Sequence, residues 1–179
     1  NNPKNRCYLC KKYMFEQIKS AANSQGIKIV VDGSNLDDTK EYRPGMQAKQ
    51  ELGIVSPLLE CEFTKADVRM LAKELNLELY CRPSTPCLAT RLPYGAHLDF
   101  EILNRIEQAE TILKQKCQVL SKHNLRVRVH DDIARIEVDK QCFEEVVKNA
   151  TLIEETIKKL GFKYVTLDLR GFTSGSFDK

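Results

Sequence analysis

Three cysteines of this chain have a spacing that could hold a metal ion or an iron–sulfur cluster. Cys7 and Cys10 form a C-x-x-C pair, and Cys87 lies in a proline-rich stretch. Two thiolates at the C-x-x-C spacing can reach one metal or form a redox disulfide. Structural zinc prefers four protein ligands, whereas a [4Fe–4S] cluster can be held by three and leave one iron open. With three candidate thiolates and no well-placed histidine, the pattern favours the cluster.

Cys87 differs from the remaining cysteines in its neighbours. It follows a proline in an irregular stretch, and Arg82 and Arg91 flank it. Nearby guanidinium groups favour the thiolate, the form that binds metals and attacks electrophiles. We therefore expect Cys87 to be a ligand or a nucleophile, with a buried structural thiol as the alternative. The cysteines expected to be structural are Cys61, Cys81, Cys117 and Cys142.

Polar residues after a short β-branched run at 27–31 predict a nucleotide or magnesium site. They would fall at the carboxyl end of a parallel strand, where open α/β folds bind their ligands. The paired aspartates Asp37 and Asp38 could hold Mg²⁺ or a ribose, although such pairs are as often a solvated helix cap. The candidate nucleotide and magnesium ligands are Asp32, Gly33, Asn35 and Asp38.

Several arginines could bind the phosphate or carboxylate groups of a substrate, because a guanidinium offers anions a two-pronged donor. Some of them share one face of an expected β-hairpin, where alternation places valines on the other face. The alternative for the hairpin is a cross-strand charge ladder on a solvated face. The candidate substrate- or phosphate-binding residues are Arg43, Arg91, Arg126, Arg128, Arg135 and Glu137. The sequence has no G-x-x-x-x-G-K-[ST] or G-x-G-x-x-G motif to cradle a phosphate.

The first part of the chain, residues 1–95, alternates strand and helix patterns, which predicts a parallel α/β domain. Thr64 and Asp67 form a capping box at the start of one helix. Residues 82–95 hold three prolines and a glycine, which favour an irregular and functional loop. The other expected elements are a helix at 8–22 and strands at 27–31, 54–55 and 78–81.

Residues 96–179 predict a smaller α+β domain. Asp99 is the expected cap of its first helix, and Gly161 is the expected C-terminal cap of its last helix. In order, the expected elements are a helix from 99 to 117, a hairpin of strands 126–130 and 133–138, helices at 140–149 and 152–160, and a strand at 164–169.

The composition fits a protein with a real hydrophobic core: 179 residues, 42% hydrophobic and 30% charged. No apolar stretch reaches the length a bilayer needs, and no signal-peptide pattern occurs, so we expect a soluble cytoplasmic protein with no membrane partner. Seven cysteines, an odd number, favour metal or redox chemistry in a reducing compartment over a disulfide framework. The net charge of +3 makes a nucleic-acid partner unlikely on charge grounds.

Motifs along nearly the whole chain resemble the LarE family of ATP-dependent sulfur transferases, which belong to the PP-loop pyrophosphatase group. The most specific part is the Pro-Ser-x-x-Cys-Leu-Ala-Thr-Arg segment around Cys87. The segments that carry the resemblance are Asn5–Lys11, Asp32–Asp38, Tyr42–Gly45, Ser56–Leu58, Lys65–Arg69, Pro83–Gly95 and Ala134–Val138.

The resemblance implies a fold and a reaction. The fold is a parallel-sheet PP-loop domain, like that of the adenine nucleotide alpha hydrolases, followed by a small α+β domain. The family's Ser-Gly-Gly-x-Asp-Ser pyrophosphate loop is absent and would lie before Asn1, so the N-terminal part of the first domain is expected to be missing. Such proteins use ATP and Mg²⁺ to adenylate a carboxylate of a nicotinate-derived pyridinium dicarboxylate mononucleotide. They convert it to a thiocarboxylate of the nickel-pincer cofactor of lactate racemase.

The resemblance also implies roles for the cysteines. The residue at the Cys87 position is the catalytic, sulfur-handling one, and in one branch of the family it gives up its own sulfur. In another branch it joins a C-x-x-C pair to hold a [4Fe–4S] cluster, whose open iron carries sulfur from a donor. Having Cys7 and Cys10 as well, this sequence is similar to the cluster branch. The family further implies a homo-oligomer, a trimer or a hexamer.

Two other functions stay open on the residues alone. A tRNA-thiolating PP-loop enzyme can also use three cysteines and a cluster, but it predicts a more basic surface. A zinc-stabilised binding module, which would not be an enzyme, could use Cys7, Cys10, Cys81 and Cys87 as ligands.

Overall fold

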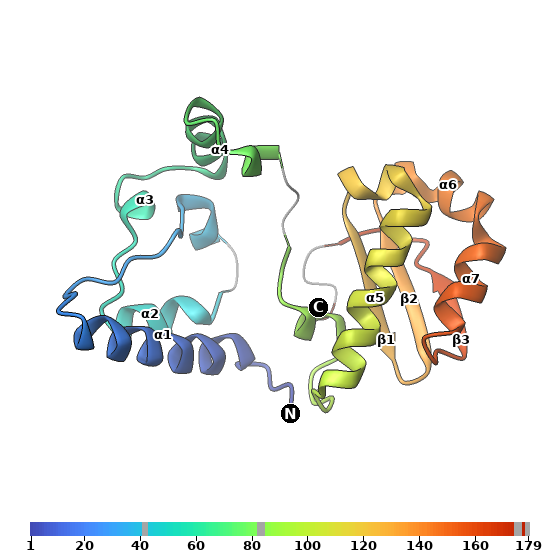
Figure 1. Ribbon diagram of the computed structural model, residues 1–179, viewed down its shortest axis with the longest axis horizontal. Helices are drawn as coiled ribbons and strands as arrows, with labels where there is room; N and C mark the ends of the chain where they lie inside the picture. The colour runs from blue at the N-terminus through green and yellow to red at the C-terminus, as the bar shows by residue number, and fades with distance from the viewer. Residues whose placement is uncertain (41–42, 82–84, 174–176, 178–179) are drawn as a thin grey trace. The chain divides into compact units, whose positions relative to one another are not determined.

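The chain forms two compact units in a computed structural model that describes residues 1–40, 43–81, 85–173 and 177 (Figure 1). The N-terminal unit comprises Lys4–Cys81, and the C-terminal unit comprises Arg82–Lys179 together with Asn1–Pro3. The two units therefore divide earlier in the sequence than the boundary after residue 95 that the motifs suggest. The segment around Cys87 joins the C-terminal unit because its 3-10 helix η3 (Leu88–Arg91) packs on the first helix and first strand there.

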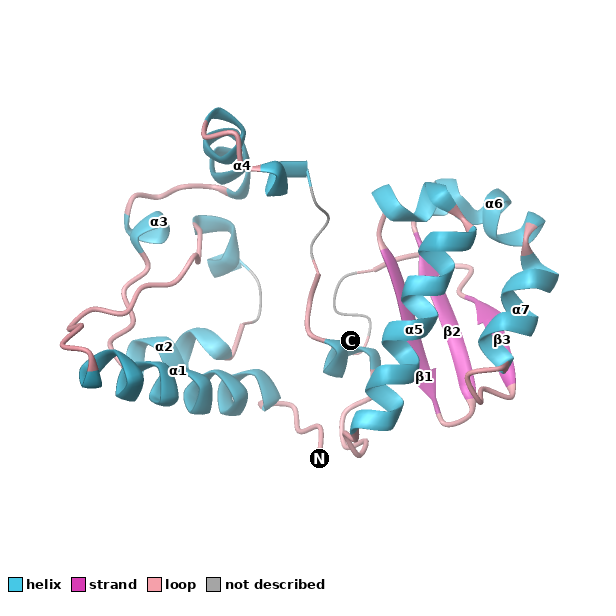
Figure 2. Ribbon diagram, viewed as in Figure 1, coloured by secondary structure: helices cyan, strands magenta, loops and turns pink. Residues whose placement is uncertain are grey.

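The C-terminal unit is built on a three-stranded sheet with the order β1-β2-β3 (Figure 2). β1 (Leu125–His130) and β2 (Ile133–Val138) form an antiparallel hairpin, and β3 (Tyr164–Leu167) pairs parallel to β2. The hairpin turn holds Asp131 at a φ of 51°, a left-handed conformation that aspartate tolerates. The predicted hairpin and the predicted closing strand are both confirmed.

Two helices cover one face of this sheet. α5 (Phe100–Lys116) packs on β1, α7 (Ala150–Lys158) packs on β3, and the two helices contact each other. α5 begins as its cap predicts, because the Asp99 side chain accepts a hydrogen bond from the Ile102 amide (2.8 Å). The remaining elements of the unit are α6 (Phe143–Lys148) and the 3-10 helices η4 (Gln118–Lys122) and η5 (Lys140–Cys142).

Alternation along the strands separates an apolar face from a charged one. Val127, Val129 and Ile136 are buried in one cluster with Ile106 and Leu113 of α5. The residues that alternate with them along the strands are on the opposite face, because successive side chains of a strand point to opposite sides. The charged face carries Arg126, Arg128, Arg135 and Glu137.

The N-terminal unit is mainly helical, and α1 (Arg6–Ser24) packs on α2 (Gly45–Glu51). Val31 and Val55 form a parallel β-bridge. The predicted helix at 8–22 is confirmed as α1, and the capped helix after Thr64 is confirmed as α4 (Lys65–Glu74). The other elements are η1 (Leu36–Lys40), α3 (Pro57–Glu60) and η2 (Glu78–Cys81).

The strands predicted for this unit take other forms. From the run 27–31 only Val31 pairs, and residues 78–81 form the 3-10 helix η2, which packs on α4. A strand needs a neighbour for its backbone groups. In residues 78–81 the backbone groups bond to residues nearby in the sequence, as in the 3.3 Å hydrogen bond from the Tyr80 amide to the Leu77 carbonyl. The structure is thus of mixed α/β class, and no described helix is both long and apolar enough to cross a membrane.

Replacing Thr64 with alanine should destabilise the N-terminal unit by about 1 kcal/mol. The Thr64 hydroxyl accepts a hydrogen bond from the Asp67 amide (3.2 Å), and the Asp67 carboxylate accepts one from the Thr64 amide (2.9 Å). Alanine removes the first of these bonds. Urea unfolding followed by circular dichroism measures the effect, and Thr64→Ser is the matched control that keeps the hydroxyl. An unchanged midpoint for Thr64→Ala would contradict this role of the cap.

Candidate functional site

Cys87 lies in a loop of residues 86–93, here named the Cys87 loop, with its thiol exposed. It is the N-terminal cap of η3. Its carbonyl accepts hydrogen bonds from the Thr90 amide (3.0 Å) and the Thr90 hydroxyl (2.7 Å). Pro86 precedes it, which fixes φ and removes one backbone donor. The loop therefore presents the sulfur to solvent on a tightly turned backbone.

Arg91 was expected to bind phosphate, but it is fully buried and bonds within the protein. Its Nε and Nη2 atoms form a two-pronged ion pair with Glu110 of α5 (2.7 and 3.0 Å). Its Nη1 atom donates to the carbonyls of Pro86 (3.1 Å) and Cys87 (3.3 Å) and to the Thr90 hydroxyl (2.9 Å). Every guanidinium nitrogen thus has an acceptor, and Arg91 positions the Cys87 loop on α5.

Two further side chains hold the same loop. Arg128 of β1 donates to the Thr90 carbonyl and pairs with Glu137 of β2 (3.0 Å). The side-chain amide of the buried Asn2 donates to the carbonyls of residues 89, 92 and 93 (3.2, 3.1 and 2.9 Å). The loop is therefore fixed from α5, from the sheet and from the first residues of the chain. Sequence patterns gave no signal for Glu110 or Asn2, because both act through partners distant in the sequence.

The charged face of the sheet is internally paired. Arg126 and Arg128 are only 6% and 5% exposed. Glu137 bridges Arg128 and Arg135 (3.0 and 2.9 Å), and Arg135 also pairs with Asp168 (3.3 Å). The cross-strand ladder considered from the sequence is therefore present, but it is buried where a solvated one was expected. Among the described residues, Arg128 and Arg135 thus share the carboxylates of Glu137 and Asp168.

Aromatic rings cover two arginines of this face, and burial lowers the pKa of two of its groups. The ring of Phe172 lies over the Arg126 guanidinium and that of Phe177 over Arg128, each 5.2 Å from the ring centroid. Burial, followed by the repulsion of Arg91, lowers the pKa of Arg126 to about 10, so the group stays charged at neutral pH. Burial and then Arg135 also lower the pKa of His130. The face is thus a largely buried array of paired charges.

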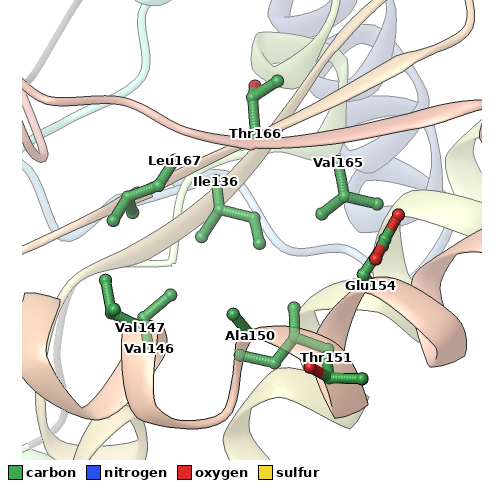
Figure 3. Close-up of a pocket in the computed structure, with 10 residues that line it drawn as sticks. Ile136, Val146, Val147, Ala150, Thr151, Glu154, Val165, Thr166 and Leu167 are labelled. Carbon is green, nitrogen blue, oxygen red and sulfur yellow. The ribbon is translucent and has the colours of Figure 1, made fainter.

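Two of the cavities that the described residues form lie in the C-terminal unit. One, of about 290 Å³, adjoins the charged face, and its lining residues are Arg135, Glu137, Asp168, Arg170, Gly171 and Thr173. The other, of about 260 Å³, lies between α6, α7 and β3, and Figure 3 shows side chains such as Val147, Ala150 and Leu167 around it. None of the residues singled out from the sequence lines the second cavity. The first is therefore the cavity with chemical groups suited to a charged substrate.

The C-x-x-C pair occupies the first turn of α1, in the N-terminal unit. Cys7 and Cys10 are both exposed and free. Residues three apart on a helix are neighbours on its surface, so the two thiols can serve one ligand. Among the described residues, no group of three Cys, His, Asp or Glu lies together so that it could hold a metal ion. The three-cysteine cluster therefore stays a prediction.

The remaining cysteines divide into two groups. Cys117 and Cys142 are buried, and burial raises the pKa of both thiols, in keeping with a structural role. Cys61 was expected to be structural but is exposed, because it ends the short surface helix α3. The side chain of Cys81, and Arg82 as a whole, lie outside the described residues. The thiols of Cys7, Cys10 and Cys87 are exposed and free, and thiolates are the soft donors that iron–sulfur clusters take.

Asp32 lies in a closed network at the end of the Val31–Val55 bridge. Its Oδ1 atom accepts hydrogen bonds from the Ser56 hydroxyl (2.5 Å) and the Ser34 amide (3.3 Å). Its Oδ2 atom accepts one from the Ser34 hydroxyl (2.8 Å) and pairs with Lys49 Nζ (2.9 Å). Burial by itself would raise the pKa of this carboxyl, but the bonds from Ser56, Lys49 and Ser34 lower it to about 2.

Gly33, Asn35 and Asp38 belong to the turn that follows Asp32. Asp38 accepts a hydrogen bond from the Asn35 amide (3.1 Å) and pairs with Arg43 (3.0 Å). Asp37 bonds to Lys40 (2.9 Å) and to the amide of Lys65 at the start of α4 (2.9 Å). The structure therefore brings the predicted nucleotide residues and Arg43 into one segment of the N-terminal unit. Each aspartate of that segment already has a cationic partner.

Comparison with known proteins adds independent information on the family. No protein-family model matches the chain. An uncharacterised protein of Synechocystis sp. is 39% identical over 99% of the chain, and one of Methanocaldococcus jannaschii is 35% identical over 97%. The pyridinium-3,5-bisthiocarboxylic acid mononucleotide synthase of Lactiplantibacillus plantarum is 36% identical over 98%. The matches cover 66%, 66% and 62% of these three proteins, so the chain spans slightly less than two thirds of their length. This similarity supports the LarE-like family for the chain.

Breaking the Arg91–Glu110 pair from one side should destabilise the C-terminal unit strongly. Arg91→Met leaves the Glu110 carboxylate buried without its cation, and such losses cost about 3–5 kcal/mol. Arg91→Met/Glu110→Leu removes both charges and should recover part of that loss, which a double-mutant cycle in urea measures. The surface pair Lys158–Glu154, with side chains 45% and 51% exposed, is the control, and its loss should have almost no effect. Equal effects for the two pairs would contradict the positioning role of Arg91.

Asp32 should make the N-terminal unit acid-sensitive in a defined window. Its folded pKa of about 2 lies below its ordinary value of 3.8, so the ionised network stabilises the fold fully above pH 4. That contribution, roughly 2 kcal/mol, is lost as the pH falls from 4 through 2. Asp32→Asn should lower stability at pH 6 and should flatten this part of the profile. A profile identical to that of the wild type would contradict the network.

Proposed function

We propose that this chain is part of a LarE-like enzyme that transfers sulfur to an activated carboxylate in cofactor biosynthesis. The observation that carries the proposal is the Cys87 loop, where an exposed thiol sits on a backbone fixed by Arg91, Arg128 and Asn2. The similarity to a pyridinium-3,5-bisthiocarboxylic acid mononucleotide synthase supports a substrate of the same class. That substrate would be a nicotinate-derived pyridinium dicarboxylate mononucleotide, and its product would serve a nickel-pincer cofactor.

The proposed reaction has two steps, because a carboxylate is a poor electrophile. First, a carboxylate oxygen attacks the α-phosphorus of ATP, which gives an acyl adenylate and releases pyrophosphate. Second, a sulfur nucleophile attacks the acyl carbon, the C–O bond to AMP breaks, and AMP leaves from the thiocarboxylate. Positive charge near the acyl carbon would stabilise the oxyanion of the second step.

Cys7, Cys10 and Cys87 would hold a [4Fe–4S] cluster in this proposal. When bound, the cluster would supply sulfur, received from a separate donor, to replace the carboxylate oxygen. All three thiols are exposed and free, and the family resemblance joins them in one set. The fixed loop would hold the Cys87 sulfur in one place while Cys7 and Cys10 contribute from the start of α1.

The charged face would bind the anionic groups of the substrate. Arg135, Glu137 and Asp168 line the adjoining cavity, so an anionic group bound there would lie beside the Arg135 guanidinium. A phosphate or carboxylate could accept two-pronged bonds from that guanidinium.

ATP would bind to the N-terminal unit at the segment from Asp32 to Asp38. Ile27, Ile29 and Val31 of this unit are apolar yet 49%, 66% and 58% exposed, so they form an apolar surface next to this segment. We also propose a cytoplasmic homo-oligomer, a trimer or a hexamer, on the basis of the family resemblance.

Anaerobic reconstitution with iron and sulfide tests the cluster. The chain should take up about four iron atoms and about four acid-labile sulfides and should gain broad visible absorbance. Cys87→Ala should lose most of the iron. Cys61→Ala is the matched control, because Cys61 is also exposed and free but lies outside the proposed set. A colourless, iron-free product, one equivalent of zinc without sulfide, or equal iron in the two variants would contradict the cluster.

A further inference from the structure

A lysine already occupies the position beside Asp32 in which a metal ion would be expected. Lys49 of α2 is only 3% exposed. Its Nζ atom contacts three oxygens: Asp32 Oδ2 (2.9 Å), Ser56 Oγ (3.4 Å) and Ser34 Oγ. An ammonium group has three donors and no acceptor. The three oxygens therefore match the three N–H groups of Lys49 one to one.

The hydrogen-bonding positions of the Asp32 carboxylate are likewise all occupied by protein donors. Each of its oxygens accepts two protein donors, which come from Ser56, Lys49 and, twice, from Ser34. A carboxylate offers about four lone-pair positions, so all of them are in use. A divalent cation would have to displace one of these donors and would then lie next to the ammonium of Lys49. The residues around Asp32 therefore do not fit Mg²⁺.

We propose that Lys49 is a positioning residue that takes the place of a metal ion in this loop, so that Asp32 shapes the nucleotide segment without binding Mg²⁺. Lys49 neutralises Asp32 and links Ser34, which follows the first strand of the Val31–Val55 bridge, to Ser56, which follows the second. The ends of both extended segments are thereby held in one arrangement. The reference to a nucleotide rests on the proposed function, whereas the network itself does not.

Under this proposal, the Mg²⁺ of the reaction is not held by Asp32 but arrives with the nucleotide. Mg²⁺ usually keeps several waters and is held largely through the phosphates of a bound nucleotide. The other aspartates of the segment also have cationic partners, Lys40 for Asp37 and Arg43 for Asp38. The metal would thus arrive with ATP, and this segment would contribute shape and hydrogen bonds to the nucleotide.

Paramagnetic NMR with Mn²⁺ tests the inference on the chain as it exists. Mn²⁺ replaces Mg²⁺ at oxygen sites and broadens the NMR signals of nearby nuclei. The carboxyl ¹³C signal of Asp32 is assigned as the one that is lost in Asp32→Asn. In the wild type this signal should stay sharp during the titration. In Lys49→Met, which keeps most of the side-chain bulk, it should broaden at Mn²⁺ concentrations lower by about tenfold or more, because the repelling ammonium is gone.

Lys40→Met is the matched control. Lys40 also pairs with an aspartate of this segment, but its side chain is 67% exposed, so its loss should leave the Asp32 signal unchanged. Broadening of the Asp32 signal in the wild type, together with loss of that Mn²⁺ binding in Asp32→Asn, would overturn the proposal. The wild-type titration decides this even if Lys49→Met does not fold. Neither readout depends on the cluster or on sulfur transfer, so a failure of the proposed function would be seen separately.

Discussion

The position of the Cys87 thiol depends on the buried ion pair between Arg91 and Glu110. Removing two charges from water is costly, and a buried pair offsets that cost only when its remaining donors and acceptors are also bonded. Here they are, since Glu110 also accepts the Val127 amide (3.0 Å) and Arg91 donates to two loop carbonyls. A single pair thus joins α5, β1 and the Cys87 loop. The placement of the Cys87 sulfur is therefore a property of the core of the C-terminal unit.

A similar ion pair occurs in the N-terminal unit, where the buried Lys49 pairs with the partly buried Asp32 and the hydroxyls of Ser34 and Ser56 complete their bonding. In both units a buried cation and its carboxylate partner fix a loop that was singled out as a candidate site. Such loops lose little conformational entropy when a ligand binds, because they are already ordered. The exposed thiols remain free of these networks and are available for ligation or attack.

The elements that the sequence predicted well are those with local signals. The Thr64–Asp67 capping box, the Asp99 cap and the alternating hairpin each depend on residues close in sequence. Long-range partners were not predictable: nothing near Arg91 distinguishes a phosphate-binding arginine from a buried one. Lys49 was missed because a lysine on a helix is expected in solvent. The strand predicted at 78–81 became η2 because β-propensity cannot supply a pairing neighbour.

The arginines of the C-terminal unit differ in their carboxylate partners. This difference distinguishes Arg91, which has a structural role, from the arginines of the charged face, where we propose that an anion binds. Arg91 meets one carboxylate in a two-pronged pair and has no exposed surface. On the charged face, Arg128 and Arg135 share Glu137, and Arg135 also pairs with Asp168. Arg128 belongs to both systems, since it also bonds to the Thr90 carbonyl of the Cys87 loop. Binding of an anion at this face would therefore act on the loop that carries the thiol through one shared side chain.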